Sequence, residues 1–193
     1  FGFYLSLSIN NCVILNVVKN LWRVCLCILI LRFAQGDKAN VKYEYMMNNE
    51  PRYNDLSAYL SAHFPYKVQK ISLNAGFTCP NRDGTVGYGG CTYCNNQTFN
   101  PAYCKTEKSV TEQLEEGKTF FARKYPDMKF LAYFQAYTNT YAELEELKRK
   151  YEEALMVKDV VGLVIGTRPD CMPDALLDYL EELNKRTFLI VEY

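Results

Sequence analysis

Three cysteines lie in one glycine-rich stretch, the cysteine loop (residues 74–96), and they offer the most evident chemistry of the chain. Cys91 and Cys94 form a Cys-x-x-Cys pair, and Cys79 precedes them by a segment rich in glycine. Thiolates are soft ligands that favour zinc and iron–sulfur clusters. Structural sites of both kinds are usually closed by four protein ligands. Three cysteines therefore predict a metal centre with one open position, where chemistry can take place.

The sequence leaves two ways of filling this open position. Cys104 lies downstream in a turn-rich connection and could supply a fourth thiolate. It would close a zinc site together with Cys79, Cys91 and Cys94, and the loop would belong to a non-catalytic zinc-binding module. Alternatively, a small polar cofactor fills the position and the loop belongs to an enzyme. Spacing alone does not choose between the two.

Strand and helix patterns alternate along the chain after residue 46. Apolar segments that fit strands recur four times, at residues 68–73, 129–135, 160–165 and 187–193. Helices are predicted before, between and after the first strands, at residues 55–62, 109–124, 141–155 and 174–184. This alternation predicts an α/β fold with a parallel sheet and right-handed crossovers.

Three of the predicted helices begin with recognisable signals. Ser109 and Glu112 have the spacing of a capping box, in which each side chain bonds the other residue's backbone amide. Asn54 could cap the first helix, and Pro173 suits the start of the last one. Local chemistry therefore supports the predicted helix starts.

A parallel sheet collects the carboxyl ends of its strands at one edge, which is where α/β proteins place their sites. The cysteine loop follows the first predicted strand, and polar residues follow the others. A doubly wound sheet and an incomplete barrel both fit this periodicity. Because a chain that stops on a strand cannot close its own barrel, we expect the N-terminal portion of a parallel (β/α) partial TIM-type barrel, truncated after about four strands.

Residues 1–45 differ in character from the rest of the chain. The first methionine is Met46, and the apolar run 24–31 is far shorter than the roughly 20 residues of a membrane-spanning helix. We therefore expect residues 1–45 to be an upstream extension outside the native protein, or a marginal helix, with no membrane association. Residues 46–193 are expected to form the N-terminal part of one core domain.

Composition narrows the function classes. A formal net charge of zero gives no electrostatic argument for nucleic acid, although a local patch could still meet an RNA. The spacing of the eight cysteines does not match a secreted disulfide scaffold. A Cys-x-x-Cys pair inside an α/β-patterned chain argues for reduced thiols, so the protein is expected in the cytoplasm.

The motif of Cys79, Cys91 and Cys94, placed just after the first strand of a β/α series, resembles the cluster motif of the radical S-adenosylmethionine superfamily. Four segments resemble one branch closely: ISLNAGFTCPNRDGTVGYGGCTYCNN, FQAYTNTYA, GTRPDCMPD and FLIVEY. This branch is the YhcC-like family, which is related to the catalytic subunit of elongator and to coproporphyrinogen dehydrogenase. The resemblance covers residues 48–193. The gap between the first two cysteines is longer than the commonest one in the superfamily, but long gaps are a feature of this branch.

The resemblance implies that Cys79, Cys91 and Cys94 hold a [4Fe–4S] cluster whose open iron binds S-adenosylmethionine. A one-electron reductant such as flavodoxin or ferredoxin would then drive cleavage of this cofactor to a 5′-deoxyadenosyl radical, which abstracts a hydrogen atom. The substrate is unknown, and RNA or a small molecule are both possible. A chain that ends after four strands is expected to be inactive alone.

The expected cofactor contacts lie at the carboxyl edge of the predicted sheet: Tyr93, Thr138, Asn139, Thr140, Arg168, Asp170 and Glu192. Tyr93 fits the family's aromatic position near the adenine, or else packs within the loop. Glu192 is a candidate ligand for the ribose or the amino group.

The superfamily's Gly-Gly-Glu motif is missing after the second strand. Asn139 and its two threonine neighbours could accept the same hydrogen bonds, or they could simply start the next helix. Arg168 could bind the cofactor carboxylate through its planar fork, or pair with Asp170 in a turn.

Overall fold

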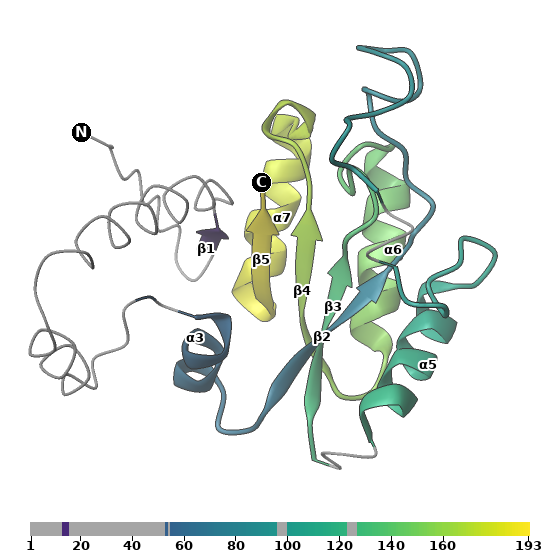
Figure 1. Ribbon diagram of the computed structural model, residues 1–193. Helices are drawn as coiled ribbons and strands as arrows, with labels where there is room; N and C mark the ends of the chain where they lie inside the picture. The colour runs from purple at the N-terminus through teal and green to yellow at the C-terminus, as the bar shows by residue number, and fades with distance from the viewer. Residues whose placement is uncertain (1–12, 16–52, 54, 96–99, 123–126) are drawn as a thin grey trace, which may run out of the picture.

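A five-stranded parallel sheet forms the centre of the computed structural model, which describes residues 13–15, 53, 55–95, 100–122 and 127–193 (Figure 1). The strand order is β1-β5-β4-β3-β2. The strands are β1 (Val13–Leu15), β2 (Val68–Leu73), β3 (Lys129–Phe134), β4 (Val160–Gly166) and β5 (Phe188–Glu192). Every neighbouring pair is parallel, so the carboxyl ends of the strands share one edge, as predicted.

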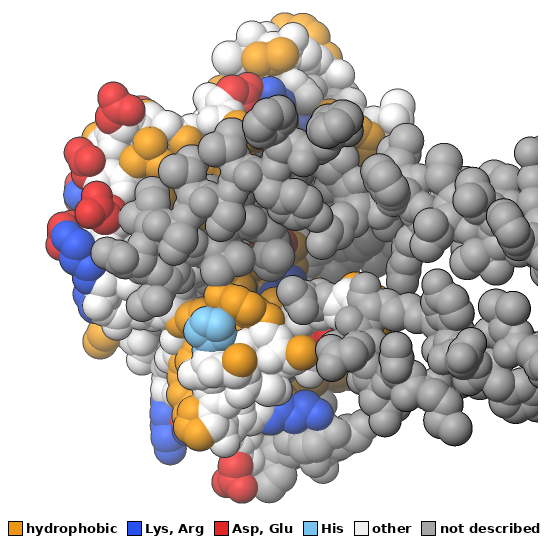
Figure 2. Space-filling view, turned by 90° about the vertical axis from the view of Figure 1, so that its left-hand side faces the viewer, with side chains coloured by type: hydrophobic (Ala, Val, Ile, Leu, Met, Phe, Trp, Pro, Cys, Tyr) orange, Lys and Arg blue, Asp and Glu red, His pale blue; other side chains and the backbone are white. Residues whose placement is uncertain are grey.

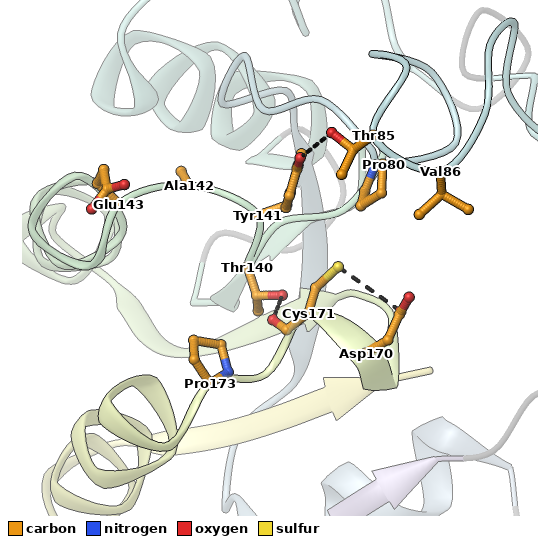
Figure 3. Close-up of a pocket in the computed structure, with 10 residues that line it drawn as sticks. All are labelled: Pro80, Thr85, Val86, Thr140, Tyr141, Ala142, Glu143, Asp170, Cys171 and Pro173. Atoms are coloured by element: carbon orange, nitrogen blue, oxygen red, sulfur yellow. Dashed lines mark hydrogen bonds between the residues drawn. The ribbon is translucent and has the colours of Figure 1, made fainter.

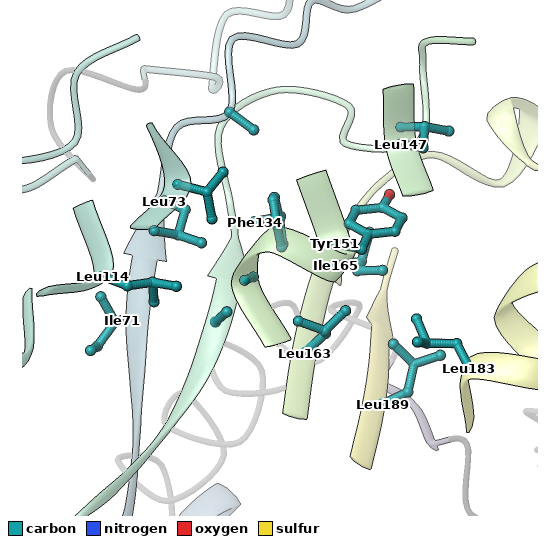
Figure 4. Packing of buried hydrophobic residues seen from close by; sticks show 14 of the residues in the cluster. Ile71, Leu73, Leu114, Phe134, Leu147, Tyr151, Leu163, Ile165, Leu183 and Leu189 are labelled. Carbon is teal, nitrogen blue, oxygen red and sulfur yellow. The ribbon is translucent and has the colours of Figure 1, made fainter. Parts of the chain in front are cut away.

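Three crossover helices cover one face of this sheet and enclose the main core. They are α5 (Val110–Ala122), α6 (Leu144–Met156) and α7 (Asp174–Arg186). Alternate strand residues point to this face, as the two-residue period of a strand requires. In Figure 4, Leu163 and Ile165 of β4 and Leu189 of β5 lie beside Tyr151 of α6 and Leu183 of α7, and all five are buried.

The short helix α3 (Leu56–His63) packs on the opposite face, at the amino-terminal end of the strands. Its residue Leu60 joins a second cluster with Leu131, Val164 and Ile190. The ring of His63 lies 4.2 Å from that of Tyr59, and Figure 2 shows hydrophobic side chains around the histidine. His63 therefore packs on the surface of this cluster.

The face that carries α3 is the concave face of a curled sheet. Register places Lys70 opposite Leu131, then Gly162, then Phe188, which lies four residues before Glu192. In a flat sheet the Cα atoms of Lys70 and Glu192 would lie about 20 Å apart, from roughly 4.8 Å per strand and 3.3 Å per residue. Their charged ends nevertheless meet at 3.0 Å. The sheet must therefore curl around this face.

The predicted elements are confirmed with small shifts at their ends. β2 has the predicted bounds, and β3, β4 and β5 differ by one residue at one or both ends. The capping box is present: Ser109 N donates to Glu112 Oε2 at 2.7 Å, and Glu112 N donates to Ser109 Oγ at 3.1 Å. The mixed α/β class and the parallel sheet thus follow from local patterns.

Two helix starts differ from the prediction. Asp55 is the N-cap of α3, since its side chain accepts a hydrogen bond from Ala58 N at 2.6 Å. Asn54, the predicted cap, lies outside the described residues. Helix α6 begins at Leu144, after the predicted start at residue 141, because Tyr141 N closes a turn onto Thr138 O at 3.1 Å.

Strand β1 lies in the segment expected to be an extension or a marginal helix. Its backbone pairs with β5, with Val13 opposite Ile190 and Leu15 opposite Glu192. The described sheet therefore has one strand more than the four expected. The rest of residues 1–45 lies outside the described residues, so the division at residue 46 stays a prediction. Within the part of the chain that the structure describes, no helix is both long and apolar enough to cross a membrane.

Candidate functional site

The cysteine loop, described through residue 95, folds above the carboxyl end of β2 on its own backbone hydrogen bonds (Figure 1). Arg82 N donates to Cys79 O at 2.8 Å, and Gly90 N donates to Asn81 O at 2.9 Å. Gly84 has a φ of +95°, where a β-carbon would be strained. The loop therefore has a defined turn before the Cys-x-x-Cys pair.

The three motif thiols are unbridged and partly exposed. Asn81 Nδ2 donates to Cys91 Sγ at 3.1 Å, and this hydrogen bond lowers the pKa of Cys91. Burial raises the pKa of Cys94, and the charges of Cys79 and Cys91 raise it further. Among the described residues, however, no three His, Cys, Asp or Glu side chains are arranged so that they could hold a metal ion. The thiols share one loop without forming a finished ligand set.

Arg168 connects the cysteine loop to the exit of β4. Its guanidinium makes a two-pronged contact with Asp170, with Nε 2.9 Å from Oδ1 and Nη2 2.6 Å from Oδ2. Its third nitrogen, Nη1, lies 3.8 Å from Cys79 Sγ. The turn contact with Asp170 is therefore present, and the same guanidinium also brings positive charge to the first cysteine of the motif.

The exit of β3 is a buried junction between three loops. Thr138, Asn139 and Thr140 expose 2%, 0% and 3% of their surface. Thr138 N donates to Thr78 O of the cysteine loop at 3.2 Å. Thr140 Oγ1 donates to Cys171 O at 2.6 Å, in the loop after β4. These contacts tie the three strand exits together, and none of these residues caps α6.

Asn139 is the centre of this junction. Its Nδ2 donates to both Phe134 O and Gly166 O at 2.9 Å, which joins the ends of β3 and β4. Its own carbonyl accepts a hydrogen bond from the Tyr151 hydroxyl of α6. Its Oδ1 is buried and has no hydrogen-bond partner among the described residues. At this junction, Asn139 Oδ1 is therefore an acceptor that a cofactor could still use.

A pocket of about 640 Å³ opens between the three exit loops (Figure 3). It is lined by residues from all of them: Pro80, Thr85, Val86, Thr140, Tyr141, Ala142, Glu143, Asp170, Cys171 and Pro173. The Thr85 and Tyr141 hydroxyls bridge its upper side at 2.9 Å. Its size is within the roughly 300–1,000 Å³ of small-molecule sites. The pocket is therefore large enough to admit a small molecule beside the cysteine loop.

The two other described cysteines lie in different surroundings. Cys104 is buried and its Sγ donates to Ser72 O at 2.9 Å. Burial raises the pKa of Cys104 to about 12, which keeps this thiol protonated. Cys171 is buried at the pocket, and Figure 3 shows its sulfur pointing toward the side of Pro80 and Thr85. Burial and the neighbouring charges of Asp170 and Cys79 raise the pKa of Cys171.

The last two predicted contacts, Tyr93 and Glu192, have different partners. The Tyr93 side chain is 83% exposed and therefore does not pack within the loop. A hydrogen bond with Cys91 raises the pKa of Tyr93. Glu192 lies on the concave face of the sheet, where its Oε1 is 3.0 Å from Lys70 Nζ.

The sequence prediction missed Gln113, which positions the start of the cysteine loop. This side chain of α5 is fully buried. Its Oε1 accepts from Asn74 N at 2.9 Å, and its Nε2 donates to the carbonyls of Asn74, Lys105 and Lys108. An amide on the apolar face of a predicted helix, next to Val110 and Leu114, was the available signal. Buried amides of this kind are normally fully hydrogen-bonded.

Three relatives share substantial identity with this chain. It is 48% identical over 145 residues to the uncharacterized protein YtqA of Bacillus subtilis. The aligned segment covers 75% of this chain and 45% of YtqA. It is 46% identical over 129 residues to the protein YhcC of Escherichia coli, covering 67% of this chain and 40% of YhcC. The uncharacterized protein MJ0486 of Methanocaldococcus jannaschii is 36% identical over 126 residues, covering 64% and 38%.

The chain thus spans less than half the length of the curated relatives it matches. The similarity to YhcC agrees with the name of the branch that the cysteine-loop segment resembles. No protein-family profile matches the chain, and no solved structure does.

Proposed function

We propose that this chain carries the N-terminal part of the core domain of a radical S-adenosylmethionine enzyme of the YhcC-like family. The observation that supports the proposal most is the meeting of two exit loops. The cysteine loop after β2 and Arg168 after β4 approach within 3.8 Å at the carboxyl edge of a parallel sheet. This edge is where α/β enzymes hold their cofactors.

Three thiols are suitable donors for an iron–sulfur cluster, but they must move closer together before they can bind one. Cys79, Cys91 and Cys94 lie on one loop, and the charges of Cys79 and Cys91 already raise the pKa of Cys94. Because no described group could hold a metal ion as it stands, the loop must tighten when a cluster is loaded. A structured loop that closes on its ligand is common where metal binding and folding are coupled.

When bound, a [4Fe–4S] cluster would supply the electron that cleaves S-adenosylmethionine. The residues of the chain bind and orient. Asn81 stabilises the Cys91 thiolate by donating to its sulfur. Arg168 offsets negative charge at Cys79, and Asp170 fixes the guanidinium in place. Tyr93, beside the motif, is free to cover an adenine, since it is largely exposed.

The junction at Thr138, Asn139 and Thr140 mainly positions the neighbouring loops and makes little direct contact with a cofactor. Its buried side chains fix the distance between the exits of β3 and β4. The unpartnered Asn139 Oδ1 could accept a hydrogen bond from a cofactor amine, in place of the missing Gly-Gly-Glu motif. Asp170 and Glu143 add carboxylates at the rim of the pocket.

We propose a partial (β/α) barrel in place of a doubly wound sheet. The three crossover helices all pack on one face, whereas a doubly wound sheet has helices on both. The curl of the sheet toward its other face supports the same assignment. YtqA and YhcC are each more than twice as long as the segment that aligns with this chain, which leaves room in them for the remaining strands of a barrel.

The proposed chemistry requires a one-electron reductant such as flavodoxin or ferredoxin and a cytoplasmic setting. Five described cysteines without a bridge support a reducing environment. We propose an RNA or a small molecule as the substrate of the whole protein.

The test is anaerobic reconstitution of the full chain with iron and sulfide, followed by measurement of both elements and of the visible absorbance. We expect about four irons and four sulfides per chain. Cys94→Ala should abolish loading, and Cys104→Ala, at the buried thiol on Ser72 O, should retain it. One tightly bound zinc with no sulfide would instead support the zinc-binding module.

A further inference from the structure

An ion pair and a tyrosine form a cluster on the concave face of the sheet, which we call the Lys70 cluster (Lys70, Tyr133 and Glu192). Lys70 Nζ of β2 lies 3.0 Å from Glu192 Oε1 of β5. The same ammonium lies 4.1 Å from the ring centroid of Tyr133 of β3. Burial and a hydrogen bond with Glu192 raise the pKa of the Tyr133 phenol. Three strands thus bring an ammonium, a carboxylate and a phenol together.

The buried core next to this cluster is apolar. Leu131, Val164 and Ile190 are its buried neighbours on the same face. A charged pair among such residues loses solvation, and well-packed apolar side chains often stabilise a protein as well or better. Stability alone therefore does not explain why this face carries charges.

The charges can be reached by a solute. The side chains of Lys70 and Glu192 retain 24% and 17% exposure. Helix α3 packs at the other end of the strands, where Val68 and Phe188 begin β2 and β5. The cluster lies toward the carboxyl ends, since Glu192 is the last residue of β5. It therefore opens toward the same edge as the cysteine loop.

We propose that the Lys70 cluster binds an oxyanion of the substrate, a carboxylate or a phosphate. Glu192 holds the ammonium of Lys70 while the site is empty, and the oxyanion replaces it as the partner of Lys70. The Tyr133 ring limits the positions of the ammonium through a cation–π contact. The inference rests on the proposed function only in calling the anion a part of the substrate. Binding of the anion itself does not need the iron–sulfur cluster.

The test uses the full chain without metal, with its lysines ¹³C-methylated for NMR. Lys70→Met identifies the Lys70 signal, and Lys129→Met identifies a matched control. Lys129 is also a half-exposed lysine of the sheet in an ion pair, with Asp159. Sodium acetate and inorganic phosphate are titrated separately against sodium chloride of equal ionic strength. The acetate and phosphate arms distinguish a carboxylate substrate from a phosphorylated one.

We expect the Lys70 signal to shift and saturate with one of these anions, with affinity on the order of tenfold above that at Lys129. Glu192→Gln should tighten this binding, because it removes the competing carboxylate, which a merely structural pair would not do. Should Lys70→Met fail to fold, Lys70→Arg supplies the assignment. Equal shifts at both lysines, or shifts that follow ionic strength alone, would overturn the proposal. If the chain binds the anion at Lys70 but takes up no iron–sulfur cluster on reconstitution, only the proposed function is contradicted.

Discussion

The two strand exits that face each other across the pocket are built in opposite ways. The exit of β3, at Thr138 to Thr140, is buried and bonded to the backbone of both neighbouring loops. The exit of β2, the cysteine loop, has three partly exposed thiols and bonds mainly to itself. The exit of β3 is therefore fixed before any ligand binds. The exit of β2 carries thiols that are not yet arranged around a common centre.

This difference separates positioning from ligation. Groups that only position a site can satisfy one another within the protein, and burial then strengthens their hydrogen bonds. Groups that bind a ligand must keep some capacity unused, as the free thiols of the cysteine loop do. The junction after β3 should therefore control stability, and the cysteine loop should control reactivity.

Thiol reactivity should differ most between the two kinds of surroundings. Burial raises the pKa of Cys104 to about 12, so at pH 8 its thiolate fraction is about a thousandfold smaller than for a thiol at the ordinary 9.0. A hydrogen bond from Asn81 lowers the pKa of Cys91, so its thiolate forms at lower pH. Alkylation of the metal-free protein, followed by peptide mass spectrometry, should label Cys91 first among the five described cysteines and leave Cys104 unlabelled through pH 9.

Asn81→Ala is the matched variant for this comparison. It removes the hydrogen bond to Cys91 Sγ and should slow alkylation of Cys91 without changing Cys104. Comparable rates at Cys91 and Cys104 in the native chain would show that the thiol environments do not differ as the structure indicates.

Asn139→Ala should cause the largest loss of stability among the predicted site residues. The change leaves Phe134 O without its side-chain donor and removes one donor from Gly166 O in a buried junction. We expect the free energy of unfolding to fall by about 3 kcal/mol, from the cost of unsatisfied buried groups. Urea unfolding measures it, and Asn81→Ala, in the partly exposed loop, should cost less than about 1 kcal/mol. Equal losses would remove the contrast between the two exits.

The sequence was informative where a feature depends on neighbours in the chain. The strands, the capping box of Ser109 and Glu112, and the position of the cysteine loop follow from local periodicity and turn chemistry. For Asn139 the sequence offered a cofactor contact or a helix start. It did not predict the junction between strand exits, because the partners of Asn139 come from residues 134, 151 and 166. Partners of this kind appear only when strands are placed side by side.

The Lys70 cluster is a further example of the same limit. Lys70 and Glu192 are 122 residues apart in sequence and meet only because the sheet curls. Glu192 could be predicted at the end of a strand, but its partner could not. The same holds for Gln113, whose four hydrogen bonds depend on how α5 packs against the start of the cysteine loop.

A pair of threonines gives the smallest and most direct comparison between the exits. Thr140 donates to Cys171 O inside the junction, and Thr85 shares a hydrogen bond with the Tyr141 hydroxyl at the exposed upper side of the pocket. Valine has nearly the shape of threonine and lacks only the hydroxyl. Thr140→Val should lower the free energy of unfolding by about 1–2 kcal/mol, because a buried carbonyl loses its partner. Thr85→Val should cost less than about 0.5 kcal/mol, since water can replace the lost bond. Chemical denaturation of the two variants resolves this difference, and equal values would mean that burial does not distinguish the two exits.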